Sequence, residues 1–301
     1  FPKIFEIGRH YDAFCVFDAD NLVHLDFLAV MNTRLMKGQK VLQGYLSAKN
    51  PVDTWVSGTF AIAFWTVNHL WHLGKYNLGL SSCLGGTGMC ISADIVREFG
   101  WGCDCLTEDM EFSMKCLSHG IRTCWVHDAI IYDEKPLTFM ASWRQRKRWA
   151  QGQFDCSERY IPILMKEGFK RHSIVVLDGI MQLLQNYFLL ISAFYLVMTY
   201  INMFYPCFTV VLYNDALVPR QFWSVLGTIQ YVLPLIVLLQ IEVPAKIYLY
   251  WLIYPVFMYS WVPVTFLGWI HRHEKQWVHT IHTRSMQFQA ASLTRKKEID
   301  S

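Results

Sequence analysis

The chain has 301 residues, of which 53% are hydrophobic, 16% aromatic and 17% charged, and its formal net charge is +3. Soluble globular domains usually contain about 25% charged residues, so this composition excludes a chain that lies wholly in water. The net charge is modest, and no nucleic-acid partner is expected. Residues 1–172 have the mixed composition of a water-soluble domain, whereas residues 173–270 contain almost no charge.

Strand and helix patterns alternate along the first 172 residues. The apolar run at 11–17 ends at carboxylates, as a buried parallel strand does when it brings polar groups to its carboxyl end. Further strands are predicted at 40–48 and 122–134, and a strand with a short helix at 89–100. Helical patterns occupy 21–36, where Leu22, Leu25, Leu28 and Leu35 have helical spacing, and then 54–74, 105–120 and 138–155. This alternation predicts an α/β domain with a mostly parallel sheet.

Three apolar blocks follow, at 186–213, 222–241 and 247–270. Each is close to the roughly 20 residues that span a bilayer as a helix. The preceding segment, 173–185, carries Asp178, Gln182 and Gln185 at helical spacing. It is therefore predicted to be a separate amphipathic helix at the membrane interface.

Basic residues flank the apolar region on both sides, at 143–148, at 170–172 and in the tail at 271–301. Because basic segments beside a membrane mark its cytoplasmic face, the first domain and the tail are both expected in the cytosol. An even number of crossings would follow, yet there are three blocks. Pro255 and Pro263 could divide the last block, and the number of crossings stays open.

The nine cysteines include no C-x-x-C pair, which indicates reduced thiols and a cytosolic setting. Cys103 and Cys105 could belong to a metal site, but there is no second pair to complete one, so no metal is expected there. The chain begins at Phe1 without an initiator methionine, and we therefore expect that a segment precedes it.

The first motif that indicates chemistry is the segment FDADN, which ends the predicted first strand. Asp18 and Asp20 are two residues apart, so their side chains can lie on one face and bracket a cation. Carboxylate oxygens suit Mg²⁺ or Mn²⁺, which keep other positions for water and a diphosphate. The alternative is a solvated turn, because Asp-x-Asp is frequent by chance.

The second motif is the segment CLTEDMEF. Thr107 fits an N-cap, which places Glu108 and Asp109 in the first turn of a helix, where the helix dipole favours negative charge. Acidic residues are common there for structural reasons alone. The functional alternative makes Asp109 a general base that takes a proton from a sugar hydroxyl, with proximity supplying much of the rate.

The third motif is the segment WRQRKRW, in which Gln145, Arg148 and Trp149 share one helix face. An arginine fork with a neighbouring glutamine can hold a diphosphate, and an indole can stack on a sugar ring. Arg146 and Lys147 are expected to point elsewhere, towards lipid headgroups. The alternative is a basic aromatic helix on a membrane surface, which would need neither the glutamine nor the spacing.

Taken together, these motifs resemble those of the processive family 2 glycosyltransferases, which include the cellulose, hyaluronan, chitin and poly-N-acetylglucosamine synthases. The resemblance covers roughly residues 11–285, and the segment GGTGMCIS looks like the family's glycine-rich strand near the acceptor. It implies a GT-A (Rossmann-like) glycosyltransferase domain at 1–172 that lacks its N-terminal part. It also implies an interfacial helix at 173–185, a transmembrane region at 186–270 and a basic cytosolic tail at 271–301.

The resemblance also implies a role for each matching residue. Asp18 and Asp20 match the motif that binds the metal and the nucleotide diphosphate, and Asp109 matches the catalytic base. Gln145 and Arg148 match the residues that hold the diphosphate. The acceptor sugar is assigned to Trp149, Gly86, Thr87, Gly88 and Glu108.

A further segment, WVHTIHTR, follows the last apolar block and is similar to one that closes over the nucleotide in related synthases. Its candidate gating residues are Trp277, Thr280, His282 and Arg284. The alternative is a basic juxtamembrane tail that lies on anionic lipid.

The resemblance leads us to expect an inverting, Mg²⁺- or Mn²⁺-dependent enzyme of the plasma membrane. It would transfer a sugar, with N-acetylglucosamine preferred, from a UDP-sugar to a growing β-linked polysaccharide and would couple this step to export. The lipid bilayer is then a partner, and accessory membrane subunits are compatible with this function. Two rivals stay open: a non-processive transferase acting on a lipid carrier, and a non-catalytic membrane subunit. The family's first strand and its uridine-binding aspartate have no counterpart here, which leaves donor binding by this polypeptide in question.

Overall fold

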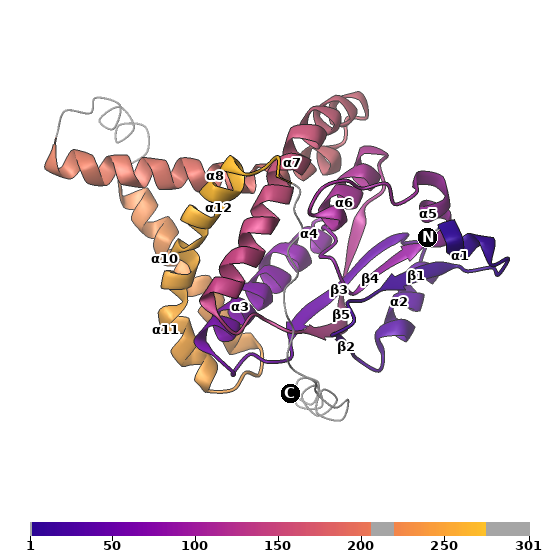
Figure 1. Cartoon of the computed structure of the whole chain (residues 1–301), viewed down its shortest axis with the longest axis horizontal. Helices are drawn as coiled ribbons and strands as arrows, with labels where there is room; N and C mark the ends of the chain where they lie inside the picture. The colour runs from indigo at the N-terminus through magenta and orange to yellow at the C-terminus, as the bar shows by residue number, and fades with distance from the viewer. Residues whose placement is uncertain (1, 206–219, 275–301) are drawn as a thin grey trace.

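A computed structural model describes residues 2–205 and 220–274, which form an α/β domain with long helices packed against it (Figure 1). Its five-stranded sheet has the order β1-β4-β3-β5-β2. The strands are β1 (Ala13–Val16), β2 (Leu22–Val23), β3 (Val41–Ala48), β4 (Met89–Ser92) and β5 (Thr123–Asp133). The middle strand, β3, is buried along its whole length. The expected mixed α/β class, consistent with a GT-A domain, is confirmed.

The prediction of a mostly parallel sheet is wrong, because only β3 and β5 pair in parallel. β4 runs antiparallel to both β1 and β3, and β2 runs antiparallel to β5. A helix between two strands permits a parallel crossover but does not require one, so the alternation of elements did not fix strand direction. β1 is also a half-buried edge strand rather than a buried one.

The helix predicted from the leucine spacing begins later and buries a different face. The helix α2 spans Phe27–Met36, after the short strand β2. Phe27 and Met31 are its buried residues, whereas Leu25 and Leu28 are 66% and 62% exposed. The face that meets the sheet is therefore set by two residues four positions apart, and the leucines do not mark it.

The remaining helices of the α/β domain lie close to their predicted positions. The segment predicted as one long helix at 54–74 is continuous, but it contains a turn of π-helix, and it begins with a capping box between Thr54 and Ser57. The helices are α1 (Pro2–Glu6), α3 (Trp55–Thr66), η1 (Val67–His72), α4 (Leu73–Asn77), α5 (Ala93–Phe99), α6 (Glu108–Ser118) and α7 (Phe139–Lys170).

The described part of the apolar region consists of α8 (Ile174–Phe204), α10 (Arg220–Gln240), α11 (Lys246–Tyr259) and α12 (Trp261–Ile270). Within it, two stretches are long and apolar enough to cross a membrane, judged by length and composition alone: Ile174–Ile201 and Lys246–Ile270. The first projects away from the sheet (Figure 1). The second is interrupted at Ser260, between α11 and α12, rather than at either of its prolines.

The separate amphipathic helix predicted at 173–185 is the first part of the continuous helix α8. Two of its three polar residues contact the α/β domain, because Lys75 Nζ lies 2.7 Å from Asp178 Oδ2 and 3.3 Å from Gln182 Oε1. Gln185 is exposed. Lys75 is only 5% exposed. At Asp178 and Gln182 the polar spacing therefore marks an internal docking face, because a buried ammonium group needs a partner of opposite charge.

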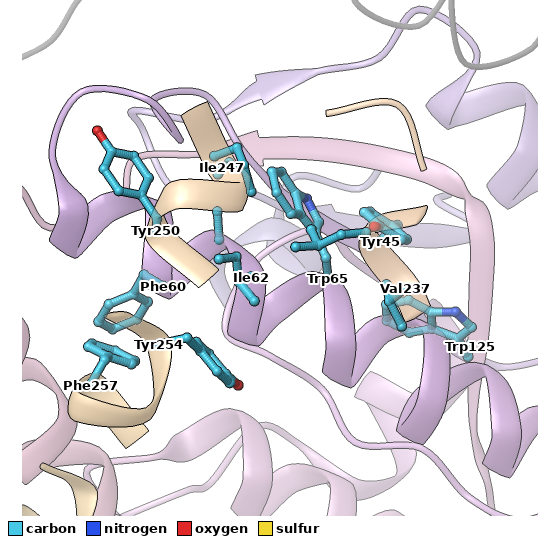
Figure 2. Packing of buried hydrophobic residues seen from close by; sticks show 13 residues of the cluster. Tyr45, Phe60, Ile62, Trp65, Trp125, Val237, Ile247, Tyr250, Tyr254 and Phe257 are labelled. Atoms are coloured by element: carbon cyan, nitrogen blue, oxygen red, sulfur yellow. The ribbon is translucent and has the colours of Figure 1, made fainter. Parts of the chain in front are cut away.

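The largest core cluster joins the sheet to the apolar helices. Figure 2 shows Phe60 of α3 beside Phe257 of α11, and Tyr250 and Tyr254 of α11 belong to the same cluster. A Cβ added to Gly58 would lie 2.1 Å from the ring of Tyr250, so a glycine is required where the two helices meet. The α/β domain and α11 thus share one hydrophobic core.

Candidate active site

The Asp-x-Asp segment forms the turn that follows β1. The backbone N–H of Asp18 donates a hydrogen bond to Thr87 Oγ1 (3.0 Å), and this hydroxyl donates in turn to Asn21 Oδ1. Asp18 is exposed, whereas the side chain of Asp20 is 22% exposed. Thr87 therefore ties the Asp-x-Asp turn to the glycine-rich segment, although the two are far apart in sequence.

Gln43, a buried residue of β3, fixes the glycine-rich segment in place. Its Nε2 donates to Thr87 O (2.9 Å), and its Oε1 accepts from the backbone N–H of the first glycine (2.8 Å). Gly86 and Gly88 have φ angles of +81° and +62°, which residues with a Cβ rarely adopt. A Cβ on Gly86 would lie 3.5 Å from Asp109 Oδ2, so this backbone passes beside that carboxylate.

Asp109 lies in the first turn of α6, where its Oδ1 accepts a hydrogen bond from Met110 N (2.8 Å). The pKa of Asp109 is raised to about 7, mainly by burial and also by the charge of Glu108, whereas the hydrogen bond from Met110 and the charge of Arg148 oppose the shift. Glu108 itself is exposed. Thr107 occupies the predicted N-cap position, but its side chain makes no capping hydrogen bond. The environment therefore brings the pKa of Asp109 from the acidic range into the neutral range.

Glu111, which the motif analysis missed, holds the loop before α6. Its Oε2 accepts from the backbone N–H groups of Asp104 (2.7 Å) and Cys105 (2.8 Å), and its Oε1 lies 3.5 Å from Arg159 Nη1 of α7. The residue is only 4% exposed. The available signal was a third acidic residue in one helical turn, which is more negative charge than the helix dipole requires.

A close helix contact brings the third motif to the second. A Cβ on Gly152 would lie 2.6 Å from Thr107 Oγ1 and 2.7 Å from Thr107 N, so a glycine is needed for α7 to approach α6. Arg148 lies one turn earlier on α7. Burial lowers the pKa of its guanidinium, and three carboxylates oppose this effect. These are Glu108, Asp109 and Asp18.

Gln145 and Trp149, the other residues of the third motif, are both half-buried. Gln145 Oε1 is buried and has no hydrogen-bond partner among the described residues. The Trp149 ring packs edge-on against Phe60 (5.9 Å between centroids) and lies 6.2 Å from Phe64, both on α3. Trp149 therefore faces the core shared with the apolar helices, while Arg148 faces the carboxylates.

The prediction that Arg146 points towards lipid headgroups is wrong, because this residue is fully buried. Burial lowers its pKa to about 10, so it is still a cation at neutral pH. Lys147, in contrast, is half-buried. The error arises because helical spacing tells which residues share a face but not which face a neighbouring helix covers.

A buried network of charges lies at the carboxyl ends of β3 and β5, and the motifs did not reveal it. Lys49 Nζ donates to Asp20 O (2.8 Å) and lies 3.2 Å from Glu134 Oε2 and 3.9 Å from Asp20 Oδ2. Next to it, Lys135 Nζ lies 2.8 Å from Asp133 Oδ1. Both lysine side chains are at most 3% exposed. Lys49 therefore connects the Asp-x-Asp turn to the middle of the sheet.

The donor set at the Asp-x-Asp turn fits a hard divalent cation. Within residues 2–205 and 220–274, no three His, Cys, Asp or Glu residues cluster as a complete metal site. Asp18 and Asp20 offer oxygen ligands only, as Mg²⁺ and Mn²⁺ prefer, and such ions commonly complete their coordination with water and substrate phosphates. The described cysteines, Cys103 and Cys105 among them, are free thiols.

The candidate gating residues Trp277, Thr280, His282 and Arg284 lie outside the described residues. Some of the other predicted site residues, which come from four sequence-distant segments, lie near one another. Thr87 joins the Asp-x-Asp turn to the glycine-rich segment, Gly86 approaches Asp109, and Arg148 interacts with carboxylates from two motifs. Trp149 lies on the neighbouring face of α7, against α3.

Comparison with known proteins agrees with this arrangement. The chain is 26% identical over 144 residues to the probable glycosyltransferase YdaM of Bacillus subtilis (strain 168). The matched region is 47% of this chain and 34% of that relative, so the chain corresponds to only part of its length. A sequence model described as "Glycosyl transferase family group 2" matches residues 13–269, which include every described site residue. The chain therefore belongs to glycosyl transferase family group 2.

Proposed function

We propose that the chain carries the catalytic region of a membrane-bound glycosyltransferase that transfers a sugar from a UDP-sugar to a growing β-linked polysaccharide. The observation that carries this proposal is the environment of Asp109, beside Gly86 and with a pKa of about 7. A general base is most effective when its pKa lies near the operating pH. A carboxylate with the ordinary pKa of about 4 would be a much weaker base.

In the proposed reaction, an acceptor hydroxyl attacks the anomeric carbon of the donor, and its proton passes to Asp109. The bond between that carbon and the UDP oxygen breaks, and UDP leaves with the electron pair. In-line attack inverts the configuration at the anomeric carbon, so an α-linked donor gives a β-linked product. Gly86 has no Cβ, so at this position no side chain contacts Asp109 Oδ2.

Arg148 is the proposed partner of the departing diphosphate. Its guanidinium is half-buried and already interacts with the carboxylates around the site, and the planar fork suits phosphate oxygens. Gln145 Oε1, buried and without a hydrogen-bond partner among the described residues, supports a role for this amide in ligand binding. Asp18 and Asp20 would hold a Mg²⁺ or Mn²⁺ ion, which when bound supplies positive charge to the leaving group.

The proposal of a polymer acceptor rests on α7 and on the apolar helices. Trp149 belongs to the same cluster as α10 and α11, and the second membrane-length stretch begins at Lys246 of α11. A product that grows at the site would thus lie next to candidate membrane helices, which supports export through the bilayer. We therefore place the enzyme in the plasma membrane, with its α/β domain in the cytosol.

One observation favours a second candidate, a non-processive enzyme that adds one sugar to a lipid carrier. Trp149 is half-buried and already packs against Phe60 and Phe64, so less of its ring is left to stack on an acceptor sugar. A lipid-linked acceptor would need Asp109 and Arg148 equally but would depend less on Trp149. The length distribution of the product separates the two candidates.

The deciding experiment supplies a panel of UDP-sugars, UDP-N-acetylglucosamine among them, to membranes that contain the complete reading frame. Mg²⁺ or Mn²⁺ is present, and the products are analysed by mass spectrometry. The proposal expects a β-linked polymer from one donor and no product from Asp109→Asn. Products with a single added sugar would favour the second candidate. No transfer from any donor would instead indicate a non-catalytic membrane subunit.

A further inference from the structure

Arg146 is an arginine of the third motif for which the transfer reaction gives no role. Its side chain is fully buried, and its Nη1 donates to Ser260 Oγ (2.7 Å) while its Nε donates to Ser142 O (3.3 Å). Its Nη2 is buried with no hydrogen-bond partner in the described part of the chain. Burying a cation without full pairing is costly, so a specific arrangement must retain it.

The guanidinium is surrounded by aromatic rings. It lies 4.5 Å from the centroid of Phe257, 5.2 Å from that of Trp261 and 5.7 Å from that of Phe139. Phe257 and Trp261 stand on either side of Ser260, the residue at which α11 ends and α12 begins. Arg146 of α7 thus contacts both α11 and α12 where they meet, through a hydrogen bond to Ser260 and cation–π contacts with Phe257 and Trp261.

Contacts further along α7 continue the same interface. A Cβ on Gly268 of α12 would lie 2.5 Å from Ala150 Cβ, and Gln151 Nε2 donates to His271 O (2.9 Å). Arg146 and Ala150 are four residues apart, so they share one face of α7. This face of α7 therefore contacts the second membrane-length stretch at Ser260 and at Gly268.

A chain of rings connects Arg146 to the proposed acceptor residue. Phe257, which lies under the guanidinium, packs edge-on against Phe60 at 5.3 Å, and Phe60 packs against Trp149 at 5.9 Å. Figure 2 shows Phe60 and Phe257 next to each other. Arg148 lies about 200° from Arg146 around the helix, so the two arginines face opposite partners. A substitution of Arg146 should therefore disturb the position of Trp149 more than it disturbs the diphosphate site.

We propose that Arg146 is a positioning residue that fixes the break between α11 and α12 to the helix carrying Gln145, Arg148 and Trp149. The part of α7 that carries these three residues and the second membrane-length stretch then move as one body. This inference rests on the proposed function for its effect on the acceptor, but the anchor itself does not depend on any activity.

The test compares Arg146→Met with Arg144→Met, a matched change at an exposed arginine of the same helix. The full chain is purified in detergent, and hydrogen–deuterium exchange is followed in the peptide that contains Ser260. The anchor predicts exchange about tenfold faster in Arg146→Met and unchanged in Arg144→Met, as the loss of desolvated cation–π contacts would cause. Equal exchange in the two variants would overturn the proposal.

Enzyme kinetics then separate positioning from general damage. With an oligosaccharide primer of the sugar that the donor panel identifies, Arg146→Met should raise the acceptor KM about tenfold while UDP affinity changes less than about twofold. Arg146→Lys keeps the charge but loses the planar fork. Its acceptor KM should therefore lie between those of the wild type and Arg146→Met. An equal loss of UDP affinity, or a normal acceptor KM, would contradict the positioning role.

Two further results keep the outcomes distinct. If Arg146→Met does not fold, Ser260→Ala removes only the hydrogen bond and should change exchange and acceptor KM in the same directions by smaller factors; no change would overturn the proposal. If the wild-type chain transfers no sugar, the proposed function fails, but the exchange comparison between Arg146→Met and Arg144→Met still decides whether the anchor exists.

Discussion

Replacing Asp109 with asparagine should abolish transfer and at the same time stabilise the protein at neutral pH. Burial raises the pKa of this carboxyl from 3.8 to about 7. At about 1.4 kcal/mol for each pH unit, this difference corresponds to at most about 4 kcal/mol of unfavourable ionisation in the folded state. Asparagine keeps an oxygen for the hydrogen bond from Met110 but never carries the charge.

The pH dependence follows from the sign of this shift. Because the folded protein holds the proton more tightly than the unfolded chain, wild-type stability falls as the pH rises from about 4 to about 7 and is then constant. Asp109→Asn does not lose this stability, because asparagine does not ionise. The two proteins should therefore unfold alike near pH 4, and the variant should become increasingly more stable up to about pH 7, with a constant difference above that pH.

Thermal unfolding of both proteins in the same detergent measures the effect. The unfolding midpoint of a domain of this size shifts by roughly 2 °C or more for each kcal/mol of stability. The midpoint of the variant should therefore exceed that of the wild type by several degrees more at pH 8 than at pH 4. Wild-type transfer should rise with pH through about 7, as Asp109 ionises. A variant that is no more stable at pH 8 than the wild type would refute the buried-base reasoning, whatever its activity.

Three further changes test the contacts around the site. Gly152→Ala places a methyl group against Thr107, so it should cost about 1–3 kcal/mol in thermal stability and lower kcat more than it lowers UDP affinity; equal losses would argue against the contact as the link between the motifs. Glu111→Gln weakens two hydrogen bonds to the loop before α6 and should make that loop more sensitive to limited proteolysis, with intact protection as the contrary result. Lys75→Met should cost about 3–5 kcal/mol because it leaves Asp178 unpaired, whereas adding Asp178→Leu should restore most of the midpoint; a double variant no better than the single would contradict the docking of α8.

The motifs could be found from the sequence because their chemistry is local. The spacing of Asp18 and Asp20, and the position of Asp109 in a first helical turn, are fixed by a few neighbouring residues. Most element positions could be predicted for the same reason. Their convergence is a tertiary property, and it depends on residues with no motif of their own, such as Gln43 and Gly152.

Errors arose where the outcome depended on partners distant in sequence. The direction of β4 is set by its neighbours in the sheet rather than by the helix patterns around it. Asp178 gave the same polar spacing as a membrane-surface helix, but its partner is Lys75, about a hundred residues earlier in the chain. Arg146 belonged to a basic cluster that a membrane surface would also explain. Only the packing of α11 and α12 shows that it is buried.

The central claim is that the Asp-x-Asp turn, Asp109 and Arg148 surround one nucleotide diphosphate. A cryo-EM structure of the full-length protein with UDP and Mn²⁺ tests it most directly. The account predicts the ion between the diphosphate and Asp18 and Asp20, with Arg148 within hydrogen-bond distance of a phosphate oxygen. A diphosphate bound away from Arg148, or an ion held by other residues, would contradict it.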